Sequence, residues 1–417
     1  MLMSVRSGVF CTFQVASRRL SGTSSFLQSD QFALSSQHTA DSSKSAVSSK
    51  RPWSMSARNT TTAVPLAYSG TAVNKDERRE FMAVFPDIVR DLTDAGRHLD
   101  VPDATKWFAK VLQYNVPGGK KNRGLAVVFA YRMLTPPQQL TPENIRLAQI
   151  LGWCVEILQA FFLVMDDVMD NALTRRGRPC WYRHNNIGTA AVNDGILLES
   201  GLYQLTRKYF SDKSYYTQIL ELFHDVTLKT SMGQSLDLLS TEFGKKPNFS
   251  KFTMDHYSAI VKYKAAYSSF QLPVALAMLM AGVKDEEMHR QAKTILLEMG
   301  HFFQVQDDFL DCFGDPAVTG KIGTDIQEGK CTWLAVVALQ RMTPEQRALF
   351  EDSYGSSDPA KIETVKELYE VLCIPSMFSV YEEETYNLIS THIQQISRGM
   401  PHQLFFKLLD KISRRVC

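Results

Sequence analysis

From about residue 76 onward, apolar residues recur three and four positions apart over long segments, which is the spacing of α-helices that pack into a core. Few segments show the strict alternation of a half-buried strand. Two helix starts carry the same device, Thr141–Glu143 and Thr343–Glu345, in which a threonine can cap the helix and a proline occupies its first turn. We therefore expect an all-α protein with one large helical domain over residues 71–417.

The first 70 residues have a different composition. They are rich in Ser, Thr and Ala, and three arginines precede Asp30, the first acidic residue. An arginine- and serine-rich N-terminus that lacks acids is typical of a mitochondrial transit peptide, whereas the alternative is a plain disordered tail. We expect residues 1–70 to be a disordered leader that directs the chain to the mitochondrial matrix. A second start at Met55 would give a cytosolic form.

Charge and cysteine content exclude some classes of protein. The net charge is only +2, which argues against binding nucleic acid through a basic face. The seven cysteines are scattered without a CxxC pair, so neither a zinc site nor a disulfide framework is expected. The uncharged stretch over residues 265–283 holds Ser268, Ser269 and Pro273, which leave too short an apolar run for a membrane span. It is better interpreted as a buried core helix.

Two aspartate clusters carry the strongest chemical signal. Asp166, Asp167 and Asp170 end one apolar helical run, and Asp307, Asp308 and Asp311 end another. Residues four apart share a helix face, so the outer carboxylates of each cluster project together and repel one another. One such cluster alone could be a solvated helix end. Two copies favour a cation site, and oxygen ligands suit Mg²⁺ that bridges to substrate phosphates.

Basic residues occur where a phosphate substrate would need them. The segment Gly118–Gly124 is a glycine-rich basic loop, although its spacing excludes a Walker A loop. Arg175 and Arg176 follow the first aspartate cluster, and Lys321 and Lys330 follow the second. Glycines let the backbone approach an anion, and lysine and arginine supply charge and hydrogen-bond donors. The pattern predicts an anionic, phosphate-bearing substrate.

The sequence contains seven motifs that, in this order, resemble those of the farnesyl diphosphate synthases of animals, in the short-chain trans-prenyl diphosphate synthase family. They are GGKKNRG, LQAFFLVMDDVMD, TRRGRPCW, MGQSLDL, IVKYKAAYSSF, FFQVQDDFLD and GDPAVTGKIGTDIQEGKCTW. The resemblance covers roughly residues 75–415. It implies a helical bundle of the isoprenoid synthase type around a deep central cleft, in a homodimer. It also implies condensation of isopentenyl diphosphate with dimethylallyl and geranyl diphosphate, with three Mg²⁺ ions in each active site.

The resemblance also assigns roles to residues. It implies that the metal ligands are Asp166, Asp167, Asp170, Asp307 and Asp311. It places isopentenyl diphosphate against Lys120, Arg123, Gln159 and Arg176, and the allylic diphosphate against Arg175, Lys264, Gln304, Lys321 and Lys330. Of the latter set, Arg175, Lys264, Gln304 and Lys321 are expected to act in catalysis. Phe161 and Phe162, one helical turn before Asp166, are expected to form the floor that limits product length, although they could simply be core aromatics.

Three departures from the family pattern keep alternatives open. Ala265 stands where the family usually has threonine, Ser268 where an aromatic is common, and the C-terminal tail is less basic. A diverged terpene synthase would ionise an allylic diphosphate without condensation, and a geranyl diphosphate synthase would stop one step earlier. A silent regulatory subunit is a third alternative. The retained isopentenyl diphosphate residues favour the condensing enzyme.

Overall fold

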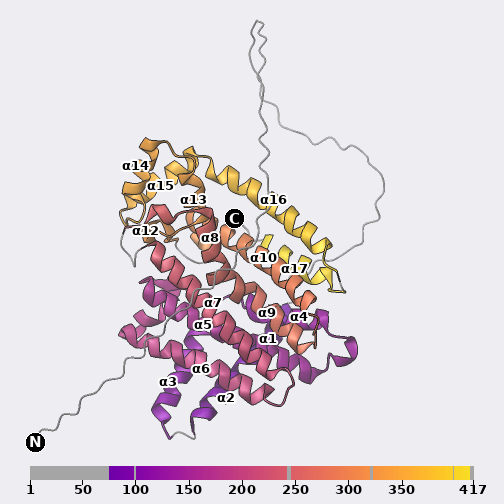
Figure 1. The fold of residues 1–417 in the computed structure, drawn as a ribbon. Helices are drawn as coiled ribbons and strands as arrows, with labels where there is room; N and C mark the ends of the chain where they lie inside the picture. The colour runs from indigo at the N-terminus through magenta and orange to yellow at the C-terminus, as the bar shows by residue number, and fades with distance from the viewer. Residues whose placement is uncertain (1–74, 98–99, 242–245, 320–322, 398, 414–417) are drawn as a thin grey trace, which may run out of the picture. The chain divides into compact units, whose positions relative to one another are not determined.

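Helices make up nearly all the regular structure of the described residues (Figure 1). The computed structural model describes residues 75–97, 100–241, 246–319, 323–397 and 399–413, all of which belong to one unit. The predicted leader, the start at Met55 and Lys321 lie outside the described residues.

In chain order the α-helices are α1 (Lys75–Ala83), α2 (Phe85–Arg97), α3 (Pro102–Asn115), α4 (Asn122–Leu134), α5 (Pro142–Met169), α6 (Ala191–Phe210), α7 (Tyr216–Ser240), α8 (Met254–Ile260), α9 (Leu272–Met280), α10 (Glu286–Phe313), α11 (Pro316–Thr319), α12 (Asp325–Glu328), α13 (Trp333–Leu339), α14 (Pro344–Ser353), α15 (Pro359–Val371), α16 (Ile374–Gln394) and α17 (His402–Ser413). Short 3₁₀ turns are η1 (Pro137–Gln139), η2 (Trp181–Asn186), η3 (Gly188–Ala190) and η4 (Phe249–Lys251), and η5 (Val261–Gln271) is a π-helix. The all-α prediction is confirmed, with one addition that the sequence did not predict: an antiparallel hairpin of β1 (Thr174–Arg175) and β2 (Arg178–Pro179).

The helix starts follow from local chemistry. The Thr141 side chain accepts a hydrogen bond from the backbone N–H of Asn144, and Pro142 occupies the first turn of α5. Thr343 forms a reciprocal capping box with Gln346 at the start of α14. Both predicted helix starts are therefore confirmed.

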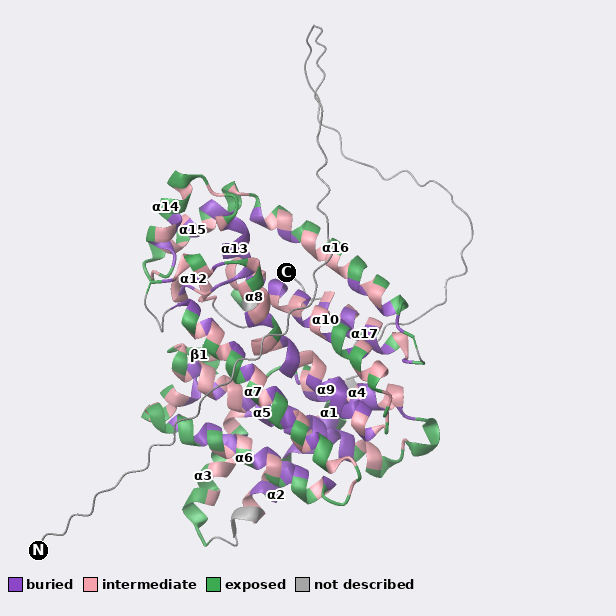
Figure 2. Ribbon diagram, viewed as in Figure 1, coloured by how far each residue is buried: buried purple, intermediate pink, exposed green. Residues whose placement is uncertain are grey.

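Two hydrophobic cores hold the helices together (Figure 2). The larger core joins α4, α5, α6, α7, α9, α10 and α17, and its largest side chains include Trp153 and Phe302. The second core lies among α8, α13, α14, α15 and the start of α16, around Phe350 and Tyr369. α10 takes part in both cores, since Phe302 belongs to the first and Val305 to the second. It therefore couples the two halves of the bundle.

Two glycines let the π-helix η5 lie against its neighbours at backbone distance. A Cβ atom on Gly233 of α7 would lie 2.6 Å from Cα of Lys264, and one on Gly300 of α10 would lie 2.7 Å from Cα of Ala266. Ordinary van der Waals contact begins near 3.4 Å. π-Helices are rare and are frequent at functional sites. η5 is thus held between α7 and α10 at a fixed depth.

The predicted core helix is also confirmed. Residues 265–283 form most of η5 and all of α9, in which Leu272, Val274 and Leu276 are buried. Among the described residues, one helix is long and apolar enough to cross a membrane, α5, and 78% of its apolar window is buried inside the bundle. Burial of that extent is typical of a central core helix.

Candidate active site

Three aspartates lie together at the C-terminal end of α5. Asp166 and Asp167 occupy the last turn, and Asp170 is the C-cap residue. The helix is fixed there because residues 147–158 are buried and α5 packs against α4 and α6. Carboxylates in this position face the negative end of the helix dipole as well as one another. The cluster therefore requires compensating positive charge.

Arg175, on the hairpin, supplies part of that charge. Its Nε and Nη2 atoms donate to Oδ1 of Asp167 at 2.9 and 2.6 Å, and Nη2 lies 3.5 Å from Oδ2 of Asp166. Asp167 is only 3% exposed, and burial raises the pKa of its carboxyl group against the lowering effect of Arg175. A two-donor contact of this kind orients a guanidinium group firmly. Arg175 thus ties the hairpin to the end of α5.

Two lysines neutralise the other carboxylates. Lys264 Nζ lies 3.3 Å from Asp166 Oδ1, and Lys330 Nζ donates to Asp170 Oδ2 at 2.8 Å. Burial raises the pKa of Asp166, but the charges of Lys264, Lys330 and Arg175 outweigh it and lower the pKa to about 2. Asp166 is therefore ionised at neutral pH. The structure brings together all three first-cluster aspartates with three of the predicted cations.

Lys264 has a second anionic partner that sequence analysis missed. Its Nζ donates to Oδ2 of Asp237, on α7, at 2.6 Å. Burial lowers the pKa of Lys264, but Asp166 and Asp237 raise it further, so the ammonium group stays charged. The available signal was the position of Asp237 as a lone acid in the apolar helix end MGQSLDLL. Asp237 thus holds Lys264 in place.

Asp308, the middle aspartate of the second cluster, is buried and accepts hydrogen bonds within the protein. Asp308 is 5% exposed, accepts a 2.9 Å hydrogen bond from Gln304 Nε2 and another of 2.9 Å from the backbone N–H of Trp333. Burial raises its pKa to about 7. Gln304 was predicted to face the allylic diphosphate, whereas here its amide donates to Asp308. This pair fixes α10 to the start of α13.

The outer aspartates of that cluster, Asp307 and Asp311, are half-buried. Asp311 Oδ2 accepts a hydrogen bond of 2.9 Å from the backbone N–H of Asp325, which opens α12. The first residue of α12 is thereby tied to α10. Lys321 lies outside the described residues, so its predicted contact stays a prediction.

A short segment connects the two clusters. Lys330 contacts Asp170 of the first cluster, and Trp333, three residues later, contacts Asp308 of the second. Within the described ranges, no group of three or more His, Cys, Asp and Glu side chains is close enough to form a complete metal cage.

The basic loop contains one buried lysine and one exposed lysine. Lys121 is 2% exposed; its Nζ donates to Val116 O at 2.5 Å and to Glu156 Oε2 at 2.7 Å. The other oxygen of Glu156 accepts from the backbone N–H of Gly124 at 2.9 Å. Burial lowers the pKa of Lys121 to about 8, against the raising effect of Glu156. Lys120 is exposed, so its predicted contact with isopentenyl diphosphate stays a prediction, whereas the Lys121–Glu156 pair was not predicted.

Three predicted isopentenyl diphosphate residues lie around this loop. Arg123 donates from Nε and Nη2 to Ser269 Oγ at 3.1 and 2.8 Å, which directs it toward η5. Arg176 donates to Asn115 O at 2.9 Å. Gln159 is half-buried on α5, two turns before Asp166. The loop, α5 and the hairpin thus converge near the first aspartate cluster.

Phe161 and Phe162 are half-buried on α5. Their ring centroids lie 5.0 Å apart at 42°. A Cβ on Gly195 of α6 would lie 3.5 Å from the ring of Phe161, so this ring packs against α6. Both residues lie one helical turn before Asp166 on α5, and their role as a floor stays a prediction.

The donor set of the site fits a hard cation. The candidate ligands are carboxylates at the ends of two helices, and oxygen ligands are those that Mg²⁺ prefers. Asp166 Oδ1 is buried and accepts no hydrogen bond in the structure, so this oxygen has capacity for a further positive partner besides Lys264.

Comparisons with known proteins identify this arrangement. A family model described as polyprenyl synthetase matches residues 105–372. The all-helical fold and this site define a prenyltransferase of isoprenoid biosynthesis. The chain belongs to the polyprenyl synthetase family.

Similar proteins agree on the type of prenyltransferase. The chain is 57% identical to the farnesyl pyrophosphate synthase of Nezara viridula over 81% of this chain and 83% of the relative. It is 52% identical to that of Gallus gallus over 81% of this chain and 92% of the relative. The solved T. brucei farnesyl diphosphate synthase with risedronate matches with a TM-score of 0.76 at 33% identity, over 81% of this chain and 99% of that chain. The predicted resemblance is confirmed.

Proposed function

We propose that this chain condenses isopentenyl diphosphate with dimethylallyl diphosphate and then with geranyl diphosphate, to give farnesyl diphosphate. The observation that carries the proposal is the first aspartate cluster, whose carboxylates are surrounded by Arg175, Lys264 and Lys330. The names of the similar proteins support the same product.

Mg²⁺ would be held by Asp166, Asp167 and Asp170 from α5 and by Asp307 and Asp311 from α10, with three ions in each site. When bound, these ions offset the negative charge of the diphosphate leaving group. Asp308 is excluded from the ligand set because Gln304 and the backbone of Trp333 already occupy its two oxygens.

The allylic diphosphate is placed against Arg175, Lys264, Gln304, Lys321 and Lys330. Cleavage of the allylic C–O bond leaves a carbocation and puts negative charge on the diphosphate. Lys264 and Lys330 are pre-positioned by carboxylates, so they stabilise this charge with little reorganisation. The apolar side of α5 keeps water from the cation.

Isopentenyl diphosphate is placed against Lys120, Arg123, Gln159 and Arg176. Its double bond attacks the cation, a new C–C bond forms, and a proton is then lost to an oxygen of the departing diphosphate. Arg175 and Arg176, one from each predicted set, line the same cavity as Asp167, which supports a meeting of the two substrates near the end of α5.

The test is an incubation of the purified full chain with isopentenyl diphosphate, geranyl diphosphate and Mg²⁺, with products identified by mass spectrometry. We expect farnesyl diphosphate, and no product once the metal is removed with a chelator. A hydrocarbon or alcohol formed without isopentenyl diphosphate would contradict condensation and would identify a terpene synthase.

Replacement of the aromatic floor should lengthen the product. With Phe161→Ala or Phe162→Ala, the space beneath the first aspartate cluster opens and a growing chain can extend into it. We expect products of C20 or longer, measured by mass spectrometry after phosphatase treatment. Phe129→Ala, which removes an aromatic ring from α4 instead, serves as the control and should still give C15. Unchanged C15 from both floor variants would reject the role.

A homodimer is proposed from an exposed apolar face. Ile196 on α6 and Leu228, Met232 and Leu239 on α7 are between 42% and 62% exposed. The three α7 residues are four and seven positions apart, so they share one helix face. Contiguous exposed apolar surface marks protein contacts. Light scattering of the purified chain should give a mass of two chains, and the Met232→Glu variant should give the mass of a single chain.

Import into mitochondria is proposed from the composition of residues 1–70. Cell fractionation should find a shortened chain in the matrix. One full-length cytosolic band would count against import.

A further inference from the structure

Asp194 is a buried carboxylate that the proposed mechanism does not use. It lies in the first turn of α6 and is 2% exposed. Its two oxygens each accept one indole N–H, Oδ1 from Trp107 of α3 at 2.7 Å and Oδ2 from Trp181 of η2 at 2.8 Å. In the described part of the chain, no lysine, arginine or histidine forms an ion pair with this carboxylate. Asp194 thus links three elements through two neutral donors.

This arrangement contributes more to geometry than to stability. A buried carboxylate without a cation beside it carries a desolvation cost. The two neutral hydrogen bonds and the positive end of the α6 dipole offset part of that cost. The two indole rings lie 5.8 Å apart between centroids, at 47° to each other. Because each indole is tied to its own oxygen of one carboxylate, the two rings keep a single relative position.

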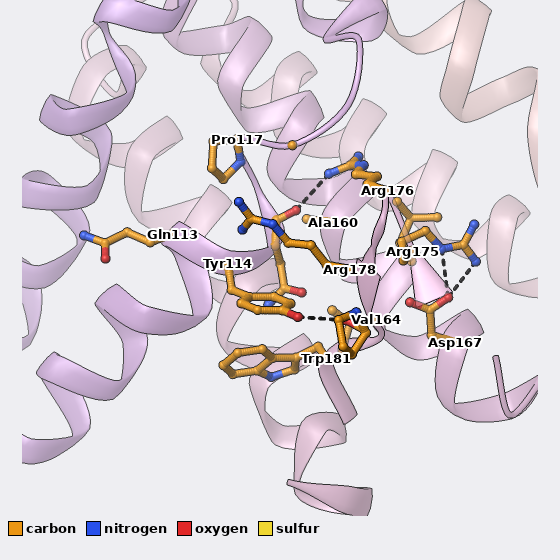
Figure 3. A pocket seen from close by; sticks show the side chains of 14 residues that line it. Gln113, Tyr114, Pro117, Ala160, Val164, Asp167, Arg175, Arg176, Arg178 and Trp181 are labelled. Carbon is orange, nitrogen blue, oxygen red and sulfur yellow. Dashed lines mark hydrogen bonds and ion pairs between the residues drawn. The ribbon is translucent and has the colours of Figure 1, made fainter. Parts of the chain in front are cut away.

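Trp181 stands at the base of the hairpin. β2 ends at Pro179, and the next residue, Cys180, donates its backbone N–H to Leu173 O at 3.1 Å, which closes the hairpin. The Trp181 ring is 1% exposed and lies next to Tyr114 of α3, with 4.9 Å between ring centroids (Figure 3). The Tyr114 hydroxyl in turn donates to Pro179 O at 2.8 Å. A shift of the Trp181 ring would therefore move the base of the hairpin.

The hairpin carries two arginines that are predicted to contact diphosphate. Arg175 lies in β1, and its guanidinium donates to the Asp167 carboxylate (Figure 3). Arg176 follows in the turn and donates to Asn115 O at 2.9 Å. Each strand has only two residues, and an isolated two-stranded hairpin is at best marginally stable. The placement of both arginines therefore depends on what holds the base of the hairpin.

We propose that Asp194 is a positioning residue, which fixes the Trp181 indole and thereby sets where the hairpin presents its two arginines to diphosphate. It touches no substrate and acts only through Trp181. The inference rests on the proposed function in one respect, the assignment of diphosphate to these two arginines. Trp107 binds the other oxygen of Asp194, but no short stretch of chain joins it to the hairpin, so it offers a matched control.

Isothermal titration of the full chain with inorganic diphosphate in the presence of Mg²⁺ tests the proposal. Trp181→Phe keeps an aromatic ring and removes the N–H. We expect its Kd to rise about tenfold, the effect of weakening one charge-assisted contact between an arginine and the phosphate. The control Trp107→Phe removes the other N–H from the same carboxylate and should bind diphosphate like the wild type. Partial unfolding would lower the number of binding sites and leave the Kd unchanged, so the Kd reports positioning.

Asp194→Asn adds a rescue experiment. Its amide has one carbonyl oxygen, so one of the two indoles would face an NH₂ group, and affinity for diphosphate should fall. Addition of Trp107→Phe leaves a single indole, and the amide can then turn its oxygen toward Trp181. The double variant should therefore bind diphosphate more tightly than Asp194→Asn alone. If Asp194 only stabilised the fold, neither substitution would change the Kd.

Equal Kd values in Trp181→Phe and Trp107→Phe would overturn the proposal, and so would a double variant that binds no better than Asp194→Asn. A wild-type chain that does not bind diphosphate would overturn it as well. Formation of farnesyl diphosphate is measured separately. A wild type that binds diphosphate but forms no farnesyl diphosphate would contradict the proposed function, while the ranking of the variants would still decide the role of Asp194.

Discussion

Lys121→Met should destabilise the protein by about 3–5 kcal/mol, the cost of leaving the partner of a buried ion pair without its counter-charge. The variant would leave the Glu156 carboxylate without its counter-charge, since Glu156 is 3% exposed and pairs with Lys121 at 2.7 Å. The glycine-rich loop would lose one of its two contacts with Glu156 of α5 at the same time, and only the Gly124 N–H bond would remain. Denaturant unfolding measures the loss.

The double variant Lys121→Met with Glu156→Gln should recover most of that stability. Two neutral groups remove the desolvation cost, and glutamine can still accept from the Gly124 N–H. Lys120→Met, an exposed neighbour, is the control and should unfold like the wild type. A double variant as unstable as Lys121→Met would contradict the assignment.

Lys121 should also change how the free energy of unfolding depends on pH. Its folded pKa of about 8 lies below the ordinary value of 10.5. Between these values the unfolded chain binds the proton that the folded chain has released, so this group makes the free energy of unfolding rise with pH. The double variant should lack this contribution between pH 8 and 10. If the free energy of unfolding of the wild type and of the double variant had the same pH dependence, the lowered pKa of Lys121 would be contradicted.

Gly233→Ala should lower kcat by about two orders of magnitude, because displacement of a reacting group by about 1 Å can cost that much. The new Cβ would overlap the backbone of η5 at Lys264, whose Cα would be 2.6 Å away. A backbone cannot rotate aside as a side chain can, so α7 and η5 must separate. Lys264 would then move relative to Asp166 and Asp237.

The sign of the stability change makes this test specific. Alanine is a better helix former than glycine by about 1 kcal/mol, so propensity alone would stabilise α7. We expect a net loss of roughly 1–3 kcal/mol from overpacking instead. Ser231→Ala, an exposed position two residues earlier on α7, is the control and should keep full activity. Wild-type kcat in Gly233→Ala would show that η5 tolerates the shift.

The helical fold was predictable because its signals are local. Apolar spacing and the Thr-Pro helix starts depend only on neighbouring residues, and both starts formed as expected. The hairpin at Thr174–Pro179 has two residues in each strand, too few to show an alternating pattern. The π-helix depends on the close contacts at Gly233 and Gly300, which join segments far apart in the sequence.

The site was predictable in type and less so in detail. The aspartate clusters and the cations around the first cluster lie where the motifs indicated. The buried pairing of Lys121 with Glu156 could not be predicted, because Lys121 has a left-handed backbone, with φ of 58°, and Glu156 is 35 residues away. The contact of Gln304 with Asp308 likewise depends on where α13 begins.

The cations around the first cluster give the resting enzyme its own counter-ions. Five carboxylates, Asp166, Asp167, Asp170, Asp237 and Glu328, are met by three cations before any ligand enters, which leaves an excess of two negative charges. Such a largely offset site needs no metal to assemble, so the chelated protein should melt at nearly the same temperature as the untreated one. The three proposed Mg²⁺ ions alone would leave the site strongly positive, and a diphosphate alone would add to its negative charge. The site is therefore suited to admit the two together, as a complex whose charges largely cancel.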